Sequence, residues 1–264
     1  MLKKKYLVHS HIFKNAGTSL HHFLKKILGS RNVLDIESLS KNYFNRSISS
    51  HEAKSIMKDN AHIICFTGHH LPIIPDEEFI NIIPLREPIK RSLSVYEYEL
   101  IQGKKGFKNL GPVNAVKLSP KEYFLWRLGL SKGYDQNGIR SNMQPKNSVI
   151  SNYQTAFILG YKDYKNIDLI DDHFLMSKEL ISKFCTPFII EKMTSSIALL
   201  LNSLNDFEIR KDINFPFANV NNNLKDKNYE EELKSLIGGE VFEILVERNK
   251  YDYLIHSFVG TKLN

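Results

Sequence analysis

Lys14 and the residues after it have the composition of a loop that could bind a phosphate-like anion. Lysine carries a full positive charge, and Thr18 and Ser19 supply hydroxyl donors. Ala16 and Gly17 leave little side chain in the way, so the backbone could approach a ligand closely. Because a helix N-terminus presents unpaired N–H groups and partial positive charge, a helix that begins here would complete an anion site.

The residues on both sides of this loop predict the elements that would hold it. Tyr6 to Phe13 is a short, mostly apolar run typical of a buried strand. After the loop, apolar residues recur at helical spacing, with Gly29 as the expected end of the helix and Thr18 or Ser19 as its cap. The pattern differs from the loop of nucleotide triphosphatases, because the lysine precedes the glycine and only one glycine is present.

A second segment predicts another anion-binding group at the same edge of a sheet. Phe79 to Leu85 is an apolar run that indicates a buried strand, and Arg86 follows it directly. Pro88 suits the first turn of the next helix, and Ser94 lies about two turns along that helix. In open α/β sheets ligands bind outside the carboxyl ends of the strands, and arginine suits bidentate contact with phosphate.

Together the two segments resemble the sulfotransferase family, in particular carbohydrate sulfotransferases whose loops read like H-x-P-K-T-x-x-T-S and L-R-D-P-x-x-R-x-x-S-x-Y. The matching stretches are His11 to Ser19 and Leu85 to Tyr96. Phe13 replaces the usual proline and Asn15 the usual threonine, and neither change removes a charge. Weaker similarities follow in family order at 151–155, 187–191 and 217–221.

The resemblance implies a donor, 3′-phosphoadenosine 5′-phosphosulfate (PAPS), and a set of residues that hold it. Arg86 and Ser94 would hold the 3′-phosphate. The 5′-phosphosulfate would be held by Lys14, Asn15, Ala16, Gly17, Thr18 and Ser19. In this scheme Lys14 also neutralises the bridging oxygen as charge develops there, so no metal is required.

His69 and His70 follow a second apolar run and are candidates for the general base. The resemblance favours His69, then His70, with an acidic residue elsewhere as a further option. Adjacent side chains on an extended segment point to opposite faces, so at most one of the two should face the donor. Neither His9 with His11 nor the adjacent pair at 21–22 has a third ligand nearby in sequence, so we expect no metal site.

The order of the predicted elements indicates one α/β domain over 1–264, a P-loop-like three-layer sandwich with a central parallel sheet flanked by helices. Strands are expected near 6–13, 62–67, 79–85 and 187–190, and helices near 18–28, 51–59, 88–101, 120–130 and 193–204. A helical tail over 229–259 would be interrupted at Gly238 and Gly239.

Two segments rich in glycine, asparagine, lysine and proline, 102–118 and 131–148, are expected to be irregular loops that shape the acceptor cleft. Their basic side chains would favour an acidic or phosphorylated acceptor: Lys104, Lys105, Lys108, Lys132, Arg140 and Lys146.

Composition narrows the class of partner. The chain has 264 residues, 42% of them hydrophobic and 25% charged, with a net charge of +7, which suits anionic partners. No block of lysine and arginine interleaved with aromatic residues is present, so nucleic acid is not an expected partner. Cys65 and Cys185 lie in or beside apolar runs and indicate core thiols. No segment reaches the ~20 apolar residues of a transmembrane helix, and we expect a cytoplasmic protein.

The sequence thus predicts a PAPS-dependent O-sulfotransferase that acts on a hydroxyl of a glycan or glycolipid. Two alternatives remain open. One is a Mg²⁺-dependent nucleotide kinase or triphosphatase, and the other is a non-catalytic module that binds an adenosine bisphosphate or a polyanion. A histidine of the 69–70 pair that points toward the Lys14 loop would favour the enzyme over the module.

Overall fold

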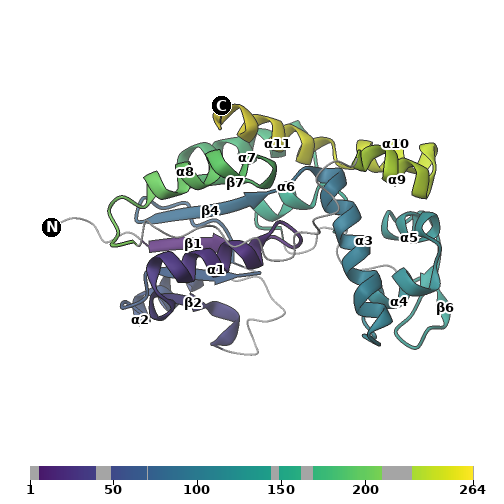
Figure 1. Cartoon of the computed structure of the whole chain (residues 1–264), viewed down its shortest axis with the longest axis horizontal. Coiled ribbons are helices and arrows are strands. Elements are labelled where there is room, and N and C mark those ends of the chain that lie inside the picture. The colour runs from purple at the N-terminus through teal and green to yellow at the C-terminus, as the bar shows by residue number, and fades with distance from the viewer. Residues whose placement is uncertain are drawn as a thin grey trace.

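The chain forms an α/β fold around a five-stranded parallel sheet (Figure 1). The computed structural model describes residues 6–39, 49–69, 71–143, 149–161, 169–209 and 228–263. The strand order is β2-β3-β1-β4-β7. The bounds are β1 Tyr6–Ser10, β2 Val33–Asp35, β3 Cys65–Gly68, β4 Phe79–Leu85 and β7 Cys185–Ile189. The predicted parallel sheet is therefore confirmed, and β4 has the predicted bounds.

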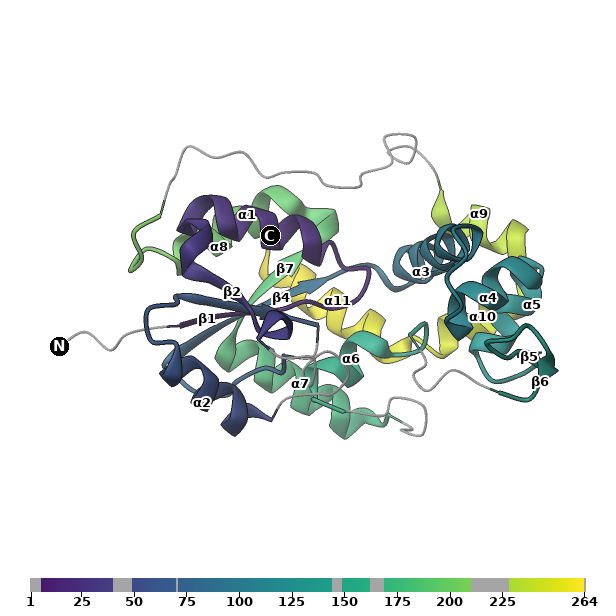
Figure 2. The same ribbon diagram turned by 90° about the horizontal axis from the view of Figure 1, so that it is seen from below.

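Helices cover both faces of this sheet and give three layers (Figures 1 and 2). One face carries α1 Gly17–Leu28 and α8 Met193–Ser203. The other carries α2 Ser50–Asp59, α6 Tyr153–Ile158, α7 Asp171–Phe184 and α11 Lys250–Lys262. Because side chains alternate along a strand, Leu7 of β1 enters the core under α1 while Val8 enters the core under α2.

Five further helices form a helical lobe beyond the carboxyl ends of the strands (Figures 1 and 2). They are α3 Pro88–Lys104, α4 Leu110–Lys117, α5 Pro120–Arg127, α9 Tyr229–Ile237 and α10 Gly239–Glu247. The lobe has its own hydrophobic core and also contains a buried ion pair between Glu99 and Arg127, with the Tyr123 hydroxyl donating to Glu99. Helix α3 is the first helix of the lobe and follows directly after β4 in the chain.

The lobe corrects the expectation of an irregular loop over 102–118. That segment contains the end of α3 and the whole of α4, separated by a short turn. The expected loop over 131–148 includes a small antiparallel hairpin of β5 Gly133–Tyr134 and β6 Arg140–Ser141, and its residues 144–148 lie outside the described part. Short 3₁₀ turns at Ser30–Asn32, Ile36–Ser38 and Ile190–Lys192 complete the chain's regular elements in the described ranges.

Several element boundaries also differ from the prediction. The first strand ends at Ser10 and not at Phe13, and β2 and α6 were not expected. The tail consists of three helices, because it breaks near Asn249 as well as at the predicted glycine pair. No described helix combines the length and apolar character needed to cross a membrane.

Candidate functional site

The Lys14 loop connects β1 to α1 at the carboxyl edge of the sheet. Lys14 and Ala16 both have left-handed backbone conformations, with φ of 65° and 52°. Asn152 is the third non-glycine residue with positive φ in the described ranges. Such conformations cost about 1–3 kcal/mol each and persist where the surrounding structure enforces them, often at functional sites. The strain of this loop is therefore concentrated where the sequence predicts anion binding.

The start of α1 is positioned as the sequence predicts but capped differently. Ala16 is the N-cap and makes no side-chain capping bond, so the prediction that Thr18 or Ser19 caps the helix is wrong. Thr18 is exposed in the first turn, whereas Ser19 is buried. The first turn contains no acidic residue. Since first-turn N–H groups have no acceptor within the helix, this end keeps its partial positive charge for an anion.

Lys14 and Arg86 lie beside each other at the mouth of this loop. The half-buried Arg86 guanidinium donates to the carbonyl oxygen of Lys14 at 3.3 Å, and the Lys14 Nζ lies 4.6 Å from the ring centre of Tyr98 on α3. Burial lowers the pKa of Lys14, the positive charge of Arg86 lowers it further, and Glu97 partly opposes both. No carboxylate within the described ranges forms an ion pair with either cation.

Arg86 also keeps unused hydrogen-bonding capacity. Its Nε is buried and has no partner in the described part of the chain. The N-terminus of α3 that follows is occupied by its own cap, because the Glu87 carboxylate accepts from the N–H groups of Ile89 and Lys90. Ser94, the other residue predicted for the 3′-phosphate, is partly exposed in the second turn of α3. The unpartnered N–H donor directly after β4 therefore belongs to the Arg86 side chain.

Asn15 contributes to the scaffold and not to the mouth of the loop. Its side chain is fully buried, and its amide nitrogen donates to the Pro84 carbonyl at 2.8 Å and to Gln154 Oε1 at 2.6 Å. The Gln154 amide also accepts from the Arg86 N–H at 2.9 Å and donates to the Arg86 carbonyl at 2.8 Å. The structure thus changes the role expected for Asn15: its amide hydrogens fix the loop against β4.

His69 lies against the same loop from the neighbouring strand β3. Its Nδ1 is 3.1 Å from the carbonyl oxygen of His11, and its ring stacks on the His11 ring with 3.9 Å between the centroids. Its backbone N–H donates to Glu37 at 2.6 Å. Because a carbonyl oxygen can only accept, Nδ1 is the donor in this bond, and the neutral form of the exposed ring then has its lone pair on Nε2. His70 lies outside the described residues.

His11 links His69 to the beginning of α1. A Cβ on Gly17 would overlap the His11 ring, so the glycine allows this ring to lie directly on the first turn of the helix. Burial, then the neighbouring His69 and His21, lowers the pKa of His11 to about 3, which keeps the ring neutral at physiological pH. His9 stacks beneath it and bonds to Thr67 at 2.9 Å. No group of three or more potential metal ligands occurs among the described residues.

A Glu191–His256 pair lies on the other side of Arg86 and was not predicted from sequence. The His256 Nε2 is 3.2 Å from Glu191, with 20% and 22% of the two side chains exposed. Burial acts to raise the pKa of Glu191, but the interaction with His256 and hydrogen bonds from backbone N–H groups outweigh it, so the pKa is lowered. The other oxygen of Glu191 accepts from the Glu87 N–H at 3.2 Å. The sequence similarity indicated Glu191, but nothing local indicated its partner 65 residues later.

The carboxyl edge therefore presents its polar groups in the order of the strands. His69 follows β3, Lys14 follows β1, Arg86 follows β4 and Glu191 follows β7. The exposed basic residues of the lobe are further away, since α3 has 17 residues and so carries Lys104 about 25 Å along its axis from Arg86. Lys105, Lys108, Lys132 and Arg140 are also exposed, and Lys146 lies outside the described residues.

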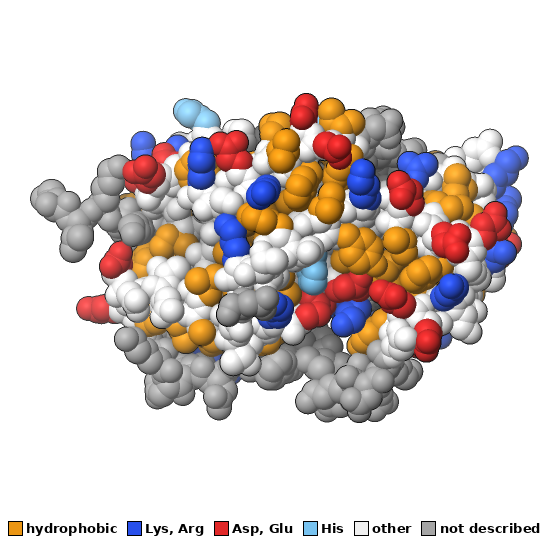
Figure 3. Space-filling view, turned by 90° about the horizontal axis from the view of Figure 1, so that it is seen from above, with side chains coloured by type: hydrophobic (Ala, Val, Ile, Leu, Met, Phe, Trp, Pro, Cys, Tyr) orange, Lys and Arg blue, Asp and Glu red, His pale blue; other side chains and the backbone are white. Residues whose placement is uncertain are grey.

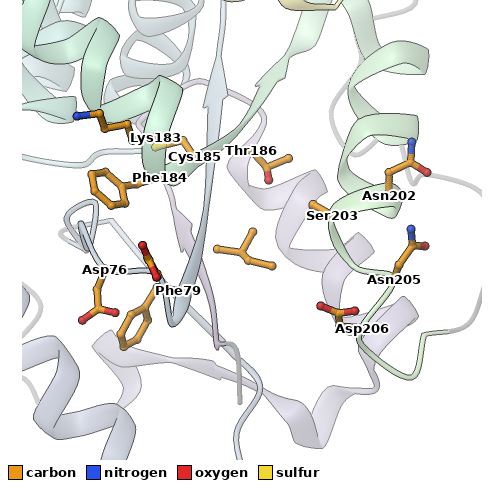
Figure 4. A pocket seen from close by; sticks show the side chains of 12 residues that line it. Asp76, Phe79, Lys183, Phe184, Cys185, Thr186, Asn202, Ser203, Asn205 and Asp206 are labelled. Carbon is orange, nitrogen blue, oxygen red and sulfur yellow. The ribbon is translucent and has the colours of Figure 1, made fainter. Parts of the chain in front are cut away.

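A cavity of about 590 Å³ lies at the opposite edge of the sheet (Figure 4). Its lining includes Phe79 and Ile80 at the start of β4, Thr186 of β7, Asn202 near the end of α8, and Asp206 in the turn that follows α8. Figure 4 shows these polar side chains around the amino ends of the strands. The cavity is therefore separate from the Lys14 loop.

The face drawn in Figure 3 has acidic, basic and hydrophobic side chains interspersed, without one continuous basic field.

Comparison with known proteins adds no further assignment. No protein-family model matches this chain, and no curated protein is significantly similar to it.

Proposed function

We propose that this chain is a sulfotransferase that moves a sulfuryl group from PAPS to an acceptor hydroxyl. The observation that carries the proposal is the juxtaposition of Lys14, the first turn of α1 and Arg86 at one sheet edge, with no carboxylate paired to either cation in the described ranges. Two adjacent but distinct cationic groups suit a ligand with two separate anionic ends. On this proposal the fold is a P-loop-like member of the three-layer α/β class.

Each end of the donor would have its own set of contacts. The Lys14 ammonium, the N–H groups of the first turn of α1, and the Thr18 hydroxyl would surround the 5′-phosphosulfate. Arg86, whose Nε has no partner among the described residues, and Ser94 would contact the 3′-phosphate. Ala16 and Gly17 would let the backbone come close to the ligand. Asn15 would act indirectly, by holding the loop on β4.

The transfer would be a direct in-line displacement. The acceptor oxygen attacks sulfur, the bond between sulfur and the bridging oxygen breaks, and adenosine 3′,5′-bisphosphate leaves. His69 Nε2 would take the proton of the acceptor hydroxyl, because its Nδ1 is committed to the His11 carbonyl. Lys14 would stabilise the negative charge that develops on the bridging oxygen. Atoms and charge balance with no further reactant.

The location of His69 supports an enzyme over a binding module. A module needs only the anion contacts, whereas here an exposed imidazole with a defined tautomer lies against His11, which itself lies on Gly17 of α1. A glycan or glycolipid remains our proposed acceptor. If the basic residues of the lobe contact it, the acceptor must be extended, because Lys104 and Lys105 lie at the far end of α3.

A calorimetric comparison of adenosine 3′,5′-bisphosphate with ADP tests the proposal. A sulfotransferase should prefer the 3′,5′-bisphosphate, because ADP places both phosphates on one side of the ribose and leaves Arg86 without a partner. A kinase or triphosphatase should prefer ADP and should need Mg²⁺. Equal binding of the two nucleotides would refute the proposal. Release of adenosine 3′,5′-bisphosphate from PAPS in the presence of glycan and glycolipid acceptors would then separate an enzyme from a module.

A further inference from the structure

The side chain of Gln154 holds the two cationic segments of the site together. Its Oε1 accepts from both the Asn15 amide, at 2.6 Å, and the Arg86 N–H, at 2.9 Å, while its Nε2 donates to the Arg86 carbonyl at 2.8 Å. We call these three hydrogen bonds the amide bridge. Asn15 and Gln154 are 0% and 1% exposed, so water does not compete for these groups. The bridge spans 139 residues of sequence.

The amide bridge fixes the backbone of Arg86 just after β4 ends. A primary amide that both accepts from and donates to one residue copies the pairing of a neighbouring strand, so it prevents rotation of the peptide groups around Arg86. From this backbone the guanidinium reaches the Lys14 carbonyl at 3.3 Å. The same Gln154 oxygen holds Asn15, which immediately follows Lys14. One side chain therefore determines where both cations stand relative to each other.

Gln154 is itself held firmly by a reciprocal pair of helix caps. The Asp252 carboxylate of α11 accepts from the N–H groups of Gln154 and Thr155 at the start of α6, at 3.1 and 2.8 Å. In return the Asn152 side chain accepts from the Tyr251 and Asp252 N–H groups at the start of α11, at 2.9 and 3.2 Å. Asn152 adopts φ of 44° to make these contacts. This arrangement leaves Gln154 little freedom to follow a displaced loop.

We propose that Gln154 is a positioning residue that determines nucleotide specificity, by setting the separation between the Lys14 loop and Arg86. This inference rests on the proposed function. The ribose fixes the distance between a 3′-phosphate and a 5′-phosphate, so a site that recognises both must hold its two cationic groups at a matching distance. A displacement of less than an ångström is enough to weaken such contacts. A ligand with phosphate only at the 5′ position does not depend on this distance.

The test compares adenosine 3′,5′-bisphosphate with AMP, which differ only in the 3′-phosphate, on the 264-residue chain by calorimetry. Gln154→Met keeps the length of the side chain but removes the amide bridge. We expect the preference for the bisphosphate over AMP to fall by about tenfold or more, as when a charge-assisted hydrogen bond is lost. The affinity for AMP should change much less. A merely structural role would not alter the ratio of the two affinities.

Asn81 of β4, the strand that precedes Arg86, provides a matched control. Its buried side chain accepts from the Ile74 N–H at 2.8 Å and donates to the carbonyls of Ile74 and Phe184, each at 2.9 Å. It therefore makes the same kind of bridge at the other end of β4, beside the cavity of Figure 4. Asn81→Leu should lower the melting temperature much as Gln154→Met does, yet leave the preference for the bisphosphate unchanged.

The outcomes separate this inference from the function on which it rests. If the wild-type chain binds the bisphosphate and AMP equally, the proposed function fails and the inference with it. If the wild type prefers the bisphosphate and Gln154→Met retains the same preference, the inference alone is wrong. A similar loss of preference in Asn81→Leu would also overturn it. Should Gln154→Met not fold, Asn15→Ala removes the loop end of the amide bridge and must lower the preference in its place.

Discussion

Replacement of Lys14 by methionine tests the charge on which the proposed chemistry depends. The ammonium group is half-buried, lies 4.6 Å from the ring centre of Tyr98, and has no carboxylate partner in the described ranges. Methionine retains much of the side-chain volume and can still contact the aromatic ring. The substitution therefore removes the positive charge while disturbing the packing of the loop as little as possible.

The expected size of the effect follows from the position of this charge. Two unit charges about 4 Å apart interact by about 4 kcal/mol at the effective dielectric of about 20 that suits a site near the protein surface. Loss of one preorganised donor to a developing negative charge lowers turnover by about 10²–10³-fold, which corresponds to a similar energy. We therefore expect kcat/KM of Lys14→Met to fall by about 10²–10³-fold.

The assay measures adenosine 3′,5′-bisphosphate released from PAPS in the presence of acceptor, with donor affinity measured separately by calorimetry. Lys178→Met is the control, since Lys178 also lies over an aromatic ring, 5.1 Å from that of Phe258, but belongs to α7. It should retain wild-type transfer. Transfer by Lys14→Met within about threefold of the wild type would refute the assigned role of Lys14, given the expected loss of about 10²–10³.

Three further predictions concern pH and packing. Because burial and Arg86 lower the pKa of Lys14 from 10.5, the rate of transfer should decline at a lower alkaline pH than it would with an ordinary lysine. Lys14→Arg should move that decline to higher pH, because arginine stays protonated. A pH profile in which the decline does not move would contradict this prediction. The pKa of His11 is about 3 in the fold against 6.5 for a free histidine, so the unfolded chain binds more protons between these values and stability is lost as pH falls below 6.5. His11→Phe should reduce this loss in urea unfolding by up to about 1.4 kcal/mol per pH unit, and an identical slope would count against a neutral buried His11. Gly111→Ala should destabilise the chain by about 1–3 kcal/mol despite alanine's helix propensity, because the new Cβ would overlap the Glu99–Arg127 pair. Thermal unfolding measures this change in stability. A stabilised variant would show that the ion pair can move aside.

The sequence was most informative where one local pattern determines an element. β4 has the bounds predicted from its apolar run, because a set of residues that is buried except for Ile80 ends at Leu85, just before the charged Arg86. Helix α1 ends at Leu28, before Gly29, which adopts the positive φ of 85° expected of a helix stop. Both elements could be predicted since their signals lie within a few residues.

Helix α4 could not be predicted, because its stability comes from a neighbour. It contains Gly111 and Pro112, which are typical of a loop, within only eight residues. It packs against α3, where Gly103 permits close contact with the Pro112 carbonyl, since a Cβ at Gly103 would overlap it. The contribution of such a contact to helix formation depends on residues that no local window includes together.

The residues of the candidate site also divide into those that local sequence could predict and those that it could not. Lys14 and Arg86 were identified because each follows a strand-like run, and the parallel sheet brings them together. The role of Asn15 could not be inferred, because its partner Gln154 lies on another element. The partnership of Glu191 with His256 depends likewise on how α11 packs near the end of β7.

The reciprocal caps between α6 and α11 also have a consequence for biosynthesis. Gln154 is fixed by Asp252, so the Lys14 loop lacks its final support until a part of the chain 238 residues further on has been made. At the usual speed of a ribosome this delay is on the order of tens of seconds. A nascent chain that has already formed β1, α1 and β4 should therefore bind nucleotide poorly. On the proposed function, nucleotide affinity would arise only once α11 has left the ribosome and docked against α6.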